Sequence, residues 1–490
     1  MVIHNISLMK ILMISPELAP FAKAGGLGDM VASLSKALAE AGHEVRIFIP
    51  CYGNIPRDKT WRAHPAPVAV HLAPQHTEFC RVWSVPFGKA QVHLLEYDNF
   101  FDSGEIYGER LDHGYRFAFQ SLAALDFCLQ TQWVPDVVHA HDWTAGLAPV
   151  ILNTTRRGSP LGKCASVFTV HNLQHQGLVT SDLLRYLHLP HWVFTADNLE
   201  CYGGINMMKG ALYHATKITT VSPSYAQEIQ TGTFGFGLDP VLRHRSPDLA
   251  GILNGIDAAE WNPATDRFLP VPFSAKNLSG KAACKAALQR ELHLNAEPDT
   301  PVFGVVARLY EQKGLDLLAE ILPDLLGRSR LQIALLGNGE KWLESRFQWL
   351  AHCFPGRCAV RIGYDNALAH LIEGGSDFFV MPSRFEPCGL NQMYSMRYGT
   401  LPVVRATGGL IDTVSPWVGA PATDGTGLLF GDASAWALRD ALHRALQLYF
   451  DHPKDFAQLR KNAMARDFSW GLSATAYTQI YEAAVKQRAG

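Results

Sequence analysis

The sequence predicts an α/β protein with two doubly wound domains, and three observations carry this prediction. Short apolar runs alternate with amphipathic stretches along most of the 490 residues. The runs are apolar throughout, which is typical of parallel strands that are covered on both faces. The alternation pauses once, in the turn-rich segment NGIDAAEWNPATDRFLPVP, where Pro and Asp cluster. We therefore place a domain junction near residue 250.

The expected elements form two series, one on each side of this junction. The expected strands are Ile11–Ser15, Val45–Ile49, Val137–His139, Ser166–Val170 and Ile218–Val221, then Val302–Val306, Ile333–Leu336, Val360–Ile362, Phe378–Met381 and Pro402–Val404. The expected helices are Asp29–Ala41, Leu315–Leu326, Lys341–His352, Ala433–Phe450 and Trp470–Gln487. Gly42 stands where a helix commonly ends in a left-handed glycine. Residues 55–115 are rich in Pro, His and aromatic residues, and we expect them to be irregular and to decorate the first domain.

Composition excludes several classes of protein. Hydrophobic residues make up 48% of the chain and charged residues 18%, which excludes global disorder. The formal net charge of -2 argues against nucleic acid or an anionic membrane as the main partner. No run reaches the roughly 20 apolar residues that span a bilayer. The nine cysteines contain no C-x-x-C pair, so we expect reduced thiols and a cytoplasmic protein.

The first candidate site is the loop KAGGLGD, Lys23 to Asp29. Gly25 and Gly26 allow close approach of a ligand to the backbone, and the helix beginning near Gly28 favours an anion. Lys23 adds a mobile cation that suits a phosphate. An ordinary strand–helix turn is the alternative. The loop lacks the G-x-G-x-x-G pattern, which argues against a dinucleotide-dependent oxidoreductase.

The second candidate site is GVVARLYEQKG, which follows the expected strand Val302–Val306. Arg308 and Lys313 would lie at the carboxyl end of a buried strand, where two cations are costly without an anion. A diphosphate fits, because Arg offers a planar fork and Lys a point charge. Pairing with a carboxylate such as Glu311 is the alternative.

The third candidate site follows the expected strand Phe378–Met381 and reads PSRFEPCGLNQMYSMRYG. Glu386 is its carboxylate, which would bind sugar hydroxyls or simply stabilise a helix N-terminus. The backbone of Cys388, Gly389 and Leu390 would lead into that helix. The later segment RATGGLIDT places Thr407, Gly408 and Gly409 in a second helix start that could hold phosphate oxygens.

Two histidine groups follow strands of the first domain. HAHDW contains His139, His141 and Asp142, and TVHNLQHQG contains His171 and His175. No further carboxylate group stands at ligand spacing, so we expect hydrogen bonding to a polar substrate rather than a metal. The chain also has no D-x-D motif, so cationic side chains and helix dipoles would have to neutralise a sugar diphosphate.

Taken together, these motifs resemble those of bacterial glycogen synthases and plant starch synthases. The resemblance rests on KAGGLGD, HAHDWTAGL, FTVHNLQHQG, ITTVSPSYAQEI, GILNGIDAAEWNPATD, ARLYEQKGLD and SRFEPCGLNQMYSMRYGTLPVVRATGGLIDTV, in order from about Lys10 to the last helix. It implies the GT-B fold, with two Rossmann-like domains that face each other across a deep cleft. The implied divisions are 1–250 (acceptor side), 251–469 (donor side) and a final helix, 470–490, that returns to the first domain.

The resemblance also implies a reaction for glycogen biosynthesis. A member of this family transfers glucose, with retention, from ADP-glucose to the non-reducing end of an α-1,4-glucan such as glycogen or a maltooligosaccharide. No cofactor or metal is implied. Another GT-B transferase, with UDP-glucose or a small acceptor, and a catalytically silent glucan-binding relative remain as alternatives. The oligomeric state stays open.

Site roles are implied at the positions that match the family's motifs. Arg308 and Lys313 would stabilise the leaving diphosphate, while Glu386 and the backbone of Cys388–Leu390 would hold the glucosyl hydroxyls. His171 and Asp142 would approach the donor sugar near its 6-hydroxyl. The implied substrate-binding residues are Lys23, Gly25, Gly26, Asp29, Cys388, Gly389, Leu390, Thr407, Gly408 and Gly409.

Two positions depart from the wider pattern. Ala24 stands where bacterial members usually have threonine, and Tyr394 stands where the superfamily often has a second glutamate. Glu386 is therefore the one carboxylate expected on its helix. Since no position is an obvious nucleophile, we expect front-face attack, in which the leaving phosphate accepts the acceptor's proton.

Overall fold

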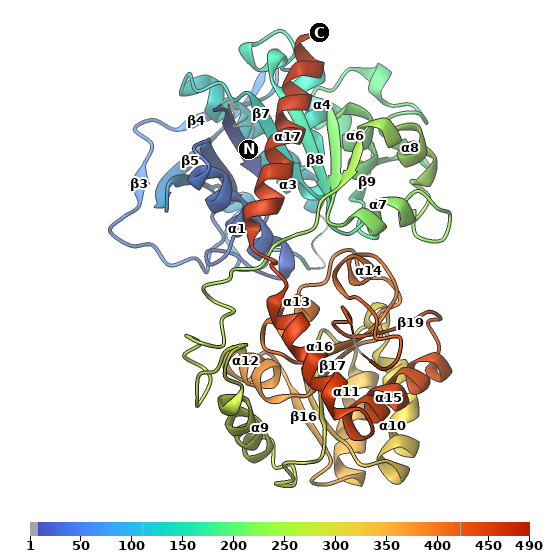
Figure 1. Cartoon of the computed structure of the whole chain (residues 1–490). Helices are drawn as coiled ribbons and strands as arrows, with labels where there is room; N and C mark the ends of the chain where they lie inside the picture. Colours follow the sequence, from blue (N-terminus) through green and yellow to red (C-terminus); the bar gives the residue numbers. More distant parts are fainter. Residues whose placement is uncertain (1–7, 109, 111, 422) are drawn as a thin grey trace. The chain divides into compact units, whose positions relative to one another are not determined.

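The computed structural model (Figure 1) describes residues 8–108, 110, 112–421 and 423–490. The chain divides into two compact units. Unit 1 consists of Met1–Gly255 and Trp470–Gly490, and unit 2 consists of Ile256–Ser469. Each unit has its own sheet with parallel strands, so the prediction of two α/β domains is confirmed. Within the described residues, no helix is both long and apolar enough to cross a membrane.

The main sheet of unit 1 has ten strands, in the order β13-β12-β8-β7-β1-β2-β6-β5-β3, and β4 pairs with β5 off this path. The strands from β13 to β6 run parallel, and β5, β4 and β3 extend the sheet antiparallel. The bounds are β1 (Lys10–Ile14), β2 (Glu44–Pro50), β3 (Arg62–Ala63), β4 (Val68–Ala73), β5 (His76–Phe87), β6 (Ala90–Glu96), β7 (Val137–His141), β8 (Ala165–Val170), β12 (Lys217–Thr220) and β13 (Leu249–Gly251). A small antiparallel sheet contains β9 (Leu178–Val179), β10 (Glu200–Cys201) and β11 (Gly204–Asn206).

The expectation that residues 55–115 are irregular is wrong. This segment contributes β3, β4, β5 and β6 to the sheets of unit 1. In β4, Val68, Val70 and Leu72 are buried while His71 is exposed. This alternation is typical of an antiparallel strand with one solvent-exposed face. Strands of this kind contain no continuous apolar run.

The helices of unit 1 connect these strands. Their bounds are α1 (Gly26–Glu40), α2 (Asp98–Phe101), α3 (His113–Gln130), α4 (Leu147–Asn153), α5 (Asp182–Tyr186), α6 (Met207–His214), α7 (Pro223–Glu228), α8 (Asp239–His244) and α17 (Trp470–Ala489). Gly42, just after α1, has a φ of 103°, as the sequence predicts.

The last helix, α17, is part of unit 1 and contacts α1, β7 and β8 (Figure 1, red). Tyr477 and Tyr481 on this helix are fully buried. The Tyr481 hydroxyl lies 2.8 Å from Nδ1 of His139, and Thr478 Oγ1 lies 3.1 Å from Nε2 of His43. The segment that closes the chain is therefore integrated into the core of unit 1.

Unit 2 is built on a six-stranded parallel sheet in the order β16-β15-β14-β17-β18-β19. The strands are β14 (Val302–Val306), β15 (Gln332–Gly337), β16 (Cys358–Ile362), β17 (Phe378–Met381), β18 (Leu401–Arg405) and β19 (Leu428–Phe430). The helices are α9 (Ser279–Glu291), α10 (Leu315–Arg328), α11 (Lys341–Cys353), α12 (Asn366–Gly375), α13 (Asn391–Arg397), α14 (Gly409–Thr413), α15 (Ala435–Phe450) and α16 (Pro453–Ala465).

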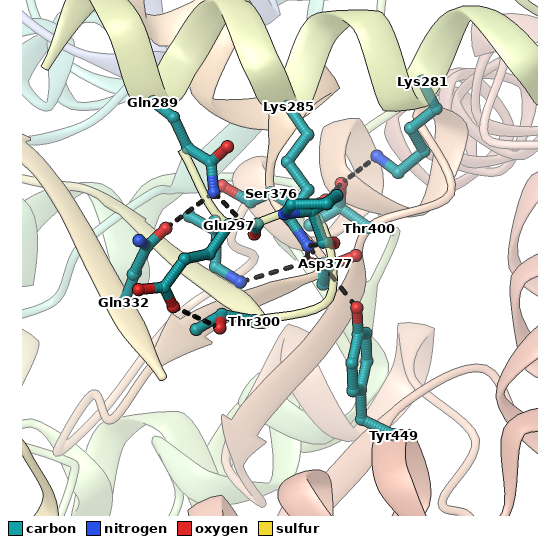
Figure 2. Close-up of polar contacts among 12 residues, drawn as sticks. Lys281, Lys285, Gln289, Glu297, Thr300, Gln332, Ser376, Asp377, Thr400 and Tyr449 are labelled. Carbon is teal, nitrogen blue, oxygen red and sulfur yellow. Dashed lines mark hydrogen bonds and ion pairs between the residues drawn. The ribbon is translucent and has the colours of Figure 1, made fainter. Parts of the chain in front are cut away.

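A buried polar network stabilises unit 2 at the amino ends of its strands. Asp377, just before β17, accepts from Lys285 Nζ at 2.8 Å and from Arg460 Nη2 at 2.7 Å. It also accepts from the Val302 amide at 3.0 Å. Figure 2 shows Asp377 beside Lys285 and Lys281 beside Thr400. Lys281 Nζ donates to Thr400 Oγ1 at 2.7 Å. Because α9 supplies both lysines and α16 the arginine, the network fixes these helices to the amino edge of the sheet. The carboxyl edge is not part of this network.

Candidate active site

In unit 2, the loops after β14 and β17 meet at the carboxyl edge of the sheet. Lys313 lies in a short 3-10 helix, Glu311–Lys313, that precedes α10. Gly314 follows with a φ of 62°, and a Cβ there would lie 2.0 Å from the carbonyl oxygen of Pro382. Only glycine permits this backbone approach, so the sequence EQKG places Lys313 against the loop that carries Glu386.

Lys313 and Glu386 form a close ion pair. Lys313 Nζ lies 2.9 Å from Oε1 and 2.8 Å from Oε2 of Glu386. The Ser383 hydroxyl also donates to Oε2, at 2.8 Å. Glu386 is only 6% exposed, whereas the Lys313 side chain keeps 20% of its surface. The expected alternative partner, Glu311, instead lies 3.9 Å from Arg384.

Arg308 lies in the same loop as Lys313, five residues earlier, and its side chain is exposed. Its guanidinium carbon lies 5.4 Å from the centre of the Tyr310 ring. In the part of the chain that the structure describes, it forms no ion pair with a carboxylate. Its cation therefore remains available for an anion.

The backbone after Glu386 packs against the start of α14. Gly409 N–H donates to the carbonyl oxygen of Glu386 at 3.1 Å. A Cβ at Gly408, whose φ is 47°, would lie 2.0 Å from that oxygen, and a Cβ at Gly409 would lie 2.1 Å from the Cys388 oxygen. Thr407 is 1% exposed. The segments Cys388–Leu390 and Thr407–Gly409, which the sequence predicted separately, are thus in direct backbone contact.

In unit 1, the first glycine-rich loop is anchored by two carboxylates. Lys23 Nζ lies 2.8 Å from Asp29 Oδ2, so these two predicted binding residues pair with each other. Glu17 Oε2 accepts hydrogen bonds from the amides of Ala24, at 2.7 Å, and Gly25, at 3.0 Å. The Gly25 amide, which the sequence assigned to a ligand, is therefore bound by Glu17 in this structure.

The histidines near β7 and β8 form a buried cluster. His139 is fully buried, with Nδ1 2.8 Å from the Tyr481 hydroxyl and Nε2 2.6 Å from Thr169 Oγ1. His141 Nδ1 lies 3.1 Å from His171 Nε2. Burial lowers the pKa of His139 and of His171 to about 3 and holds the pKa of His141 well below its usual range, so these rings are neutral at pH 7.

Substrate binding by His139 is therefore a wrong expectation, because both of its ring nitrogens are used inside unit 1. His171 is less deeply buried than His139 and keeps its candidate role. Among the described residues, no three His, Cys, Asp or Glu side chains are arranged to hold a metal ion.

Asp142 follows β7 in a left-handed conformation, with a φ of 56°. One carboxylate oxygen accepts the His171 amide at 2.7 Å and lies 3.5 Å from the Asn172 amide. Burial raises the pKa of Asp142 to about 7, although its bonds from these amides act in the opposite direction. Asp142 thus joins the loops that follow β7 and β8.

Glu17, Tyr107 and Ser383 were not predicted as site residues. Glu17 lies in the segment SPELAPFA between β1 and the first loop, and Ser383 stands three residues before Glu386. The available sequence signal was an acid inside an otherwise apolar segment after a buried strand. It does not by itself reveal which loop that acid binds.

Comparison with known proteins gives a consistent result. The starch synthase catalytic domain family matches residues 10–244, and the glycosyl transferases group 1 family matches residues 291–465. The chain is 46% identical over 478 residues to the glycogen synthase of Anaeromyxobacter sp. (strain Fw109-5), covering 96% of this chain and 99% of the relative. It is 43% identical over 490 residues to glycogen synthase 1 of Geobacter sulfurreducens, covering 98% and 97%.

Among solved structures, the catalytic domain of starch synthase IV from Arabidopsis thaliana, bound to ADP and acarbose, is similar with a TM-score of 0.91. The two chains are 36% identical, and the match covers 98% of this chain and all of the other. Sucrose-phosphate synthase from Thermosynechococcus elongatus has a TM-score of 0.61 at 18% identity, which shows likeness of fold alone.

Proposed function

This chain belongs to the glycogen synthase and starch synthase family and is a glucosyltransferase with the GT-B fold, and we propose that it elongates an α-1,4-glucan. The proposed donor is ADP-glucose, and the proposed acceptor is the non-reducing end of glycogen or a maltooligosaccharide. Two observations support the donor and the acceptor. The relatives of high identity are glycogen synthases, and the similar starch synthase is bound to ADP and acarbose.

The observation that carries the proposal is the Lys313–Glu386 pair. An ammonium has three N–H donors, and two of them account for the contacts with the two oxygens of Glu386. The third is left for a phosphate oxygen. Glu386 has about four lone-pair positions, of which Lys313 uses two and Ser383 one, so one position remains for a sugar hydroxyl. The pair can therefore contact both sides of the bond that breaks.

Charge development explains why cations are required here. Cleavage of the bond between glucose and diphosphate leaves extra negative charge on the diphosphate. We assign stabilisation of this charge to Arg308 and Lys313, with Lys23 and the Thr407–Gly409 backbone as further phosphate contacts. In this proposal no metal is needed. His171 and Asp142 of unit 1 serve the sugar near its 6-hydroxyl.

The proposed mechanism is front-face attack with retention. The candidate carboxylates are already committed, because Asp142 holds backbone amides and Glu386 holds Lys313 and Ser383. A nucleophile would need a free carboxylate on the face opposite the diphosphate. Isolation of a glucosyl adduct on either side chain would contradict this mechanism.

The test is transfer of labelled glucose to glycogen from ADP-glucose and from UDP-glucose, measured side by side. We expect faster transfer from ADP-glucose. Lys341→Ala is the matched control for substitution of Lys313, since Lys341 also pairs with a glutamate, Glu344, but its side chain is 89% exposed. This control should transfer like the wild type. Failure of the wild type to extend glycogen from ADP-glucose would overturn the proposal.

A further inference from the structure

A buried glutamate lies behind the first glycine-rich loop of unit 1. Glu17 comes three residues after the end of β1 and is only 2% exposed. Its Oε2 accepts the amides of Ala24 and Gly25, and its Oε1 accepts the hydroxyl of Tyr107 at 2.8 Å. Three donors from two separate segments therefore converge on one carboxylate.

These hydrogen bonds are what makes the buried charge tolerable. Burying an unpaired carboxylate costs several kcal/mol unless hydrogen bonds or a cation compensate it. Over the ranges that the structure describes, Glu17 has no ion pair with Lys, Arg or His, and Lys23 on the same loop pairs with Asp29. The loop amides and Tyr107 are therefore the compensation. Any loop conformation that moves these amides away would leave the charge unsatisfied.

The position of the bound amides matters for the loop. Helix α1 begins at Gly26, and Gly25 is its N-cap residue without a side-chain capping bond. Glu17 binds the amides of Ala24 and Gly25, which precede the helix. The first amides of a helix have no partner within it. The amides of Gly26 and Leu27 are such first amides of α1, and they come directly after the Ala24–Gly25 segment that Glu17 holds in place.

Tyr107 extends this arrangement to a second segment. It lies between α2 and α3, outside the loop, and donates its hydroxyl to Glu17. Tyr107 is 36% exposed as a whole, but desolvation of its hydroxyl, together with the neighbouring Glu17, holds its pKa well above the usual range, so the hydroxyl remains a donor. Tyr107 therefore fixes the orientation of the Glu17 carboxyl from the side opposite the loop.

We propose that Glu17 is a positioning residue, which holds the Ala24–Gly25 backbone so that the adjoining helix start and Lys23 receive the donor phosphates. Tyr107 acts through Glu17 by fixing its carboxyl group. The identity of the ligand rests on the proposed function, whereas the control of loop conformation by Glu17 does not.

The test compares Glu17→Gln, Glu17→Ala and Tyr107→Phe with Glu40→Gln, a control at the exposed end of α1. Glutamine keeps one acceptor oxygen for the loop amides but loses the negative charge, and its NH2 group can only donate to the Tyr107 hydroxyl, which reverses that hydrogen bond. A hydrogen bond to a charged group contributes about 1.5–3 kcal/mol, which corresponds to roughly 10- to 100-fold in affinity. We expect the Kd for ADP and the KM for ADP-glucose to rise by about 10-fold or more in Glu17→Ala.

The effect should be smaller in Glu17→Gln and smallest in Tyr107→Phe, and the KM for glycogen should not change. Equal rises in both KM values, or unchanged ADP affinity in Glu17→Ala, would overturn the inference. Hydrogen exchange of a peptide covering residues 18–27 provides a readout that needs no activity. Faster exchange there in Glu17→Ala, with the rest of unit 1 unchanged, is expected. Unchanged exchange in that peptide refutes the inference even if the wild type is an active transferase. Faster exchange with an inactive wild type supports it while the proposed function fails.

Discussion

Replacing Lys313 by alanine should damage stability and catalysis through two different physical effects. The substitution removes the ammonium that lies 2.8 Å from Glu386, whose side chain is 7% exposed. Removing one partner of a buried pair costs about 3–5 kcal/mol, because the other charge is stranded. Lys313 keeps some solvent contact and Ser383 still donates to Glu386. We therefore expect a loss at or below the bottom of that range, about 2–3 kcal/mol of unfolding free energy.

Catalysis should fall for a different reason. In the proposed site, the leaving diphosphate loses a preorganised donor when Lys313 is removed, and removal of one such donor lowers turnover by about 10²- to 10³-fold. Glu386→Ala should lower turnover by at least about 10²-fold as well, since it removes the partner that orients Lys313 and that we propose to contact the sugar.

The double variant Lys313→Ala, Glu386→Gln separates the two effects. Glutamine carries no charge, so the double variant should recover most of the stability that Lys313→Ala loses, while transfer stays low. Urea unfolding measures the stability, and transfer of labelled glucose measures the activity. Because the chain has two units, each can unfold in its own transition, and the stability is taken from the transition that the substitution shifts. If Lys313→Ala unfolds like the wild type, or if the double variant regains activity, the pair does not act as described.

Three further predictions concern other parts of the site. Burial raises the pKa of Asp142 from 3.8 to about 7, so the folded state binds its proton more tightly and stability falls as pH rises through this range. Asp142→Asn should therefore increase the free energy of unfolding above pH 7, by at most about 4 kcal/mol, and raise the melting temperature there, with no gain at pH 3.5. A gain that is independent of pH contradicts this. Gly408→Ala should cost at least about 1–3 kcal/mol and suppress transfer, because its Cβ would overlap the Glu386 carbonyl, whereas Gly327→Ala, with open space around its Cβ, should unfold like the wild type or later. Transfer should survive dialysis against a metal chelator, and a loss that added Mg²⁺ restores would show that the cations of the site are not sufficient.

The buried parallel strands were the most predictable part of the fold. Val302–Val306 and Phe378–Met381 have the bounds that their apolar runs suggest, because a strand covered on both faces has few polar positions. The antiparallel strands of residues 62–87 were missed because they carry exposed positions among the buried ones. In β5 (His76–Phe87), buried and exposed residues mix along its twelve positions, so no continuous apolar run marks it.

Sequence reasoning placed the candidate residues on loops but could not give most of their partners. A residue that follows a parallel strand lies at the carboxyl edge, which is why Lys313, Glu386 and Asp142 were identifiable. Lys313 and Glu386 are 73 positions apart, and nothing in the sequence pairs them rather than Lys313 and Glu311. For His139, sequence reasoning assigned a role in substrate binding to a residue that is structural. Its motif looks functional, but its ring bonds Tyr481 of the returning helix, 342 positions away.

The two units use the same physical device to prepare their loops. In each, carboxylates at the carboxyl edge of the sheet hold groups of the neighbouring loops: the buried Glu17 and the partly buried Asp142 hold backbone amides, and the buried Glu386 holds an ammonium. Each carboxylate is satisfied from within its own unit, so the ordering cost of the loops is met when the chain folds rather than when a ligand binds. The cations Lys23 and Arg308 remain more exposed than these acids. A net charge of -2 therefore conceals a difference in burial within each unit, because the acids that hold the loops are buried or partly buried while Lys23 and Arg308 are more exposed.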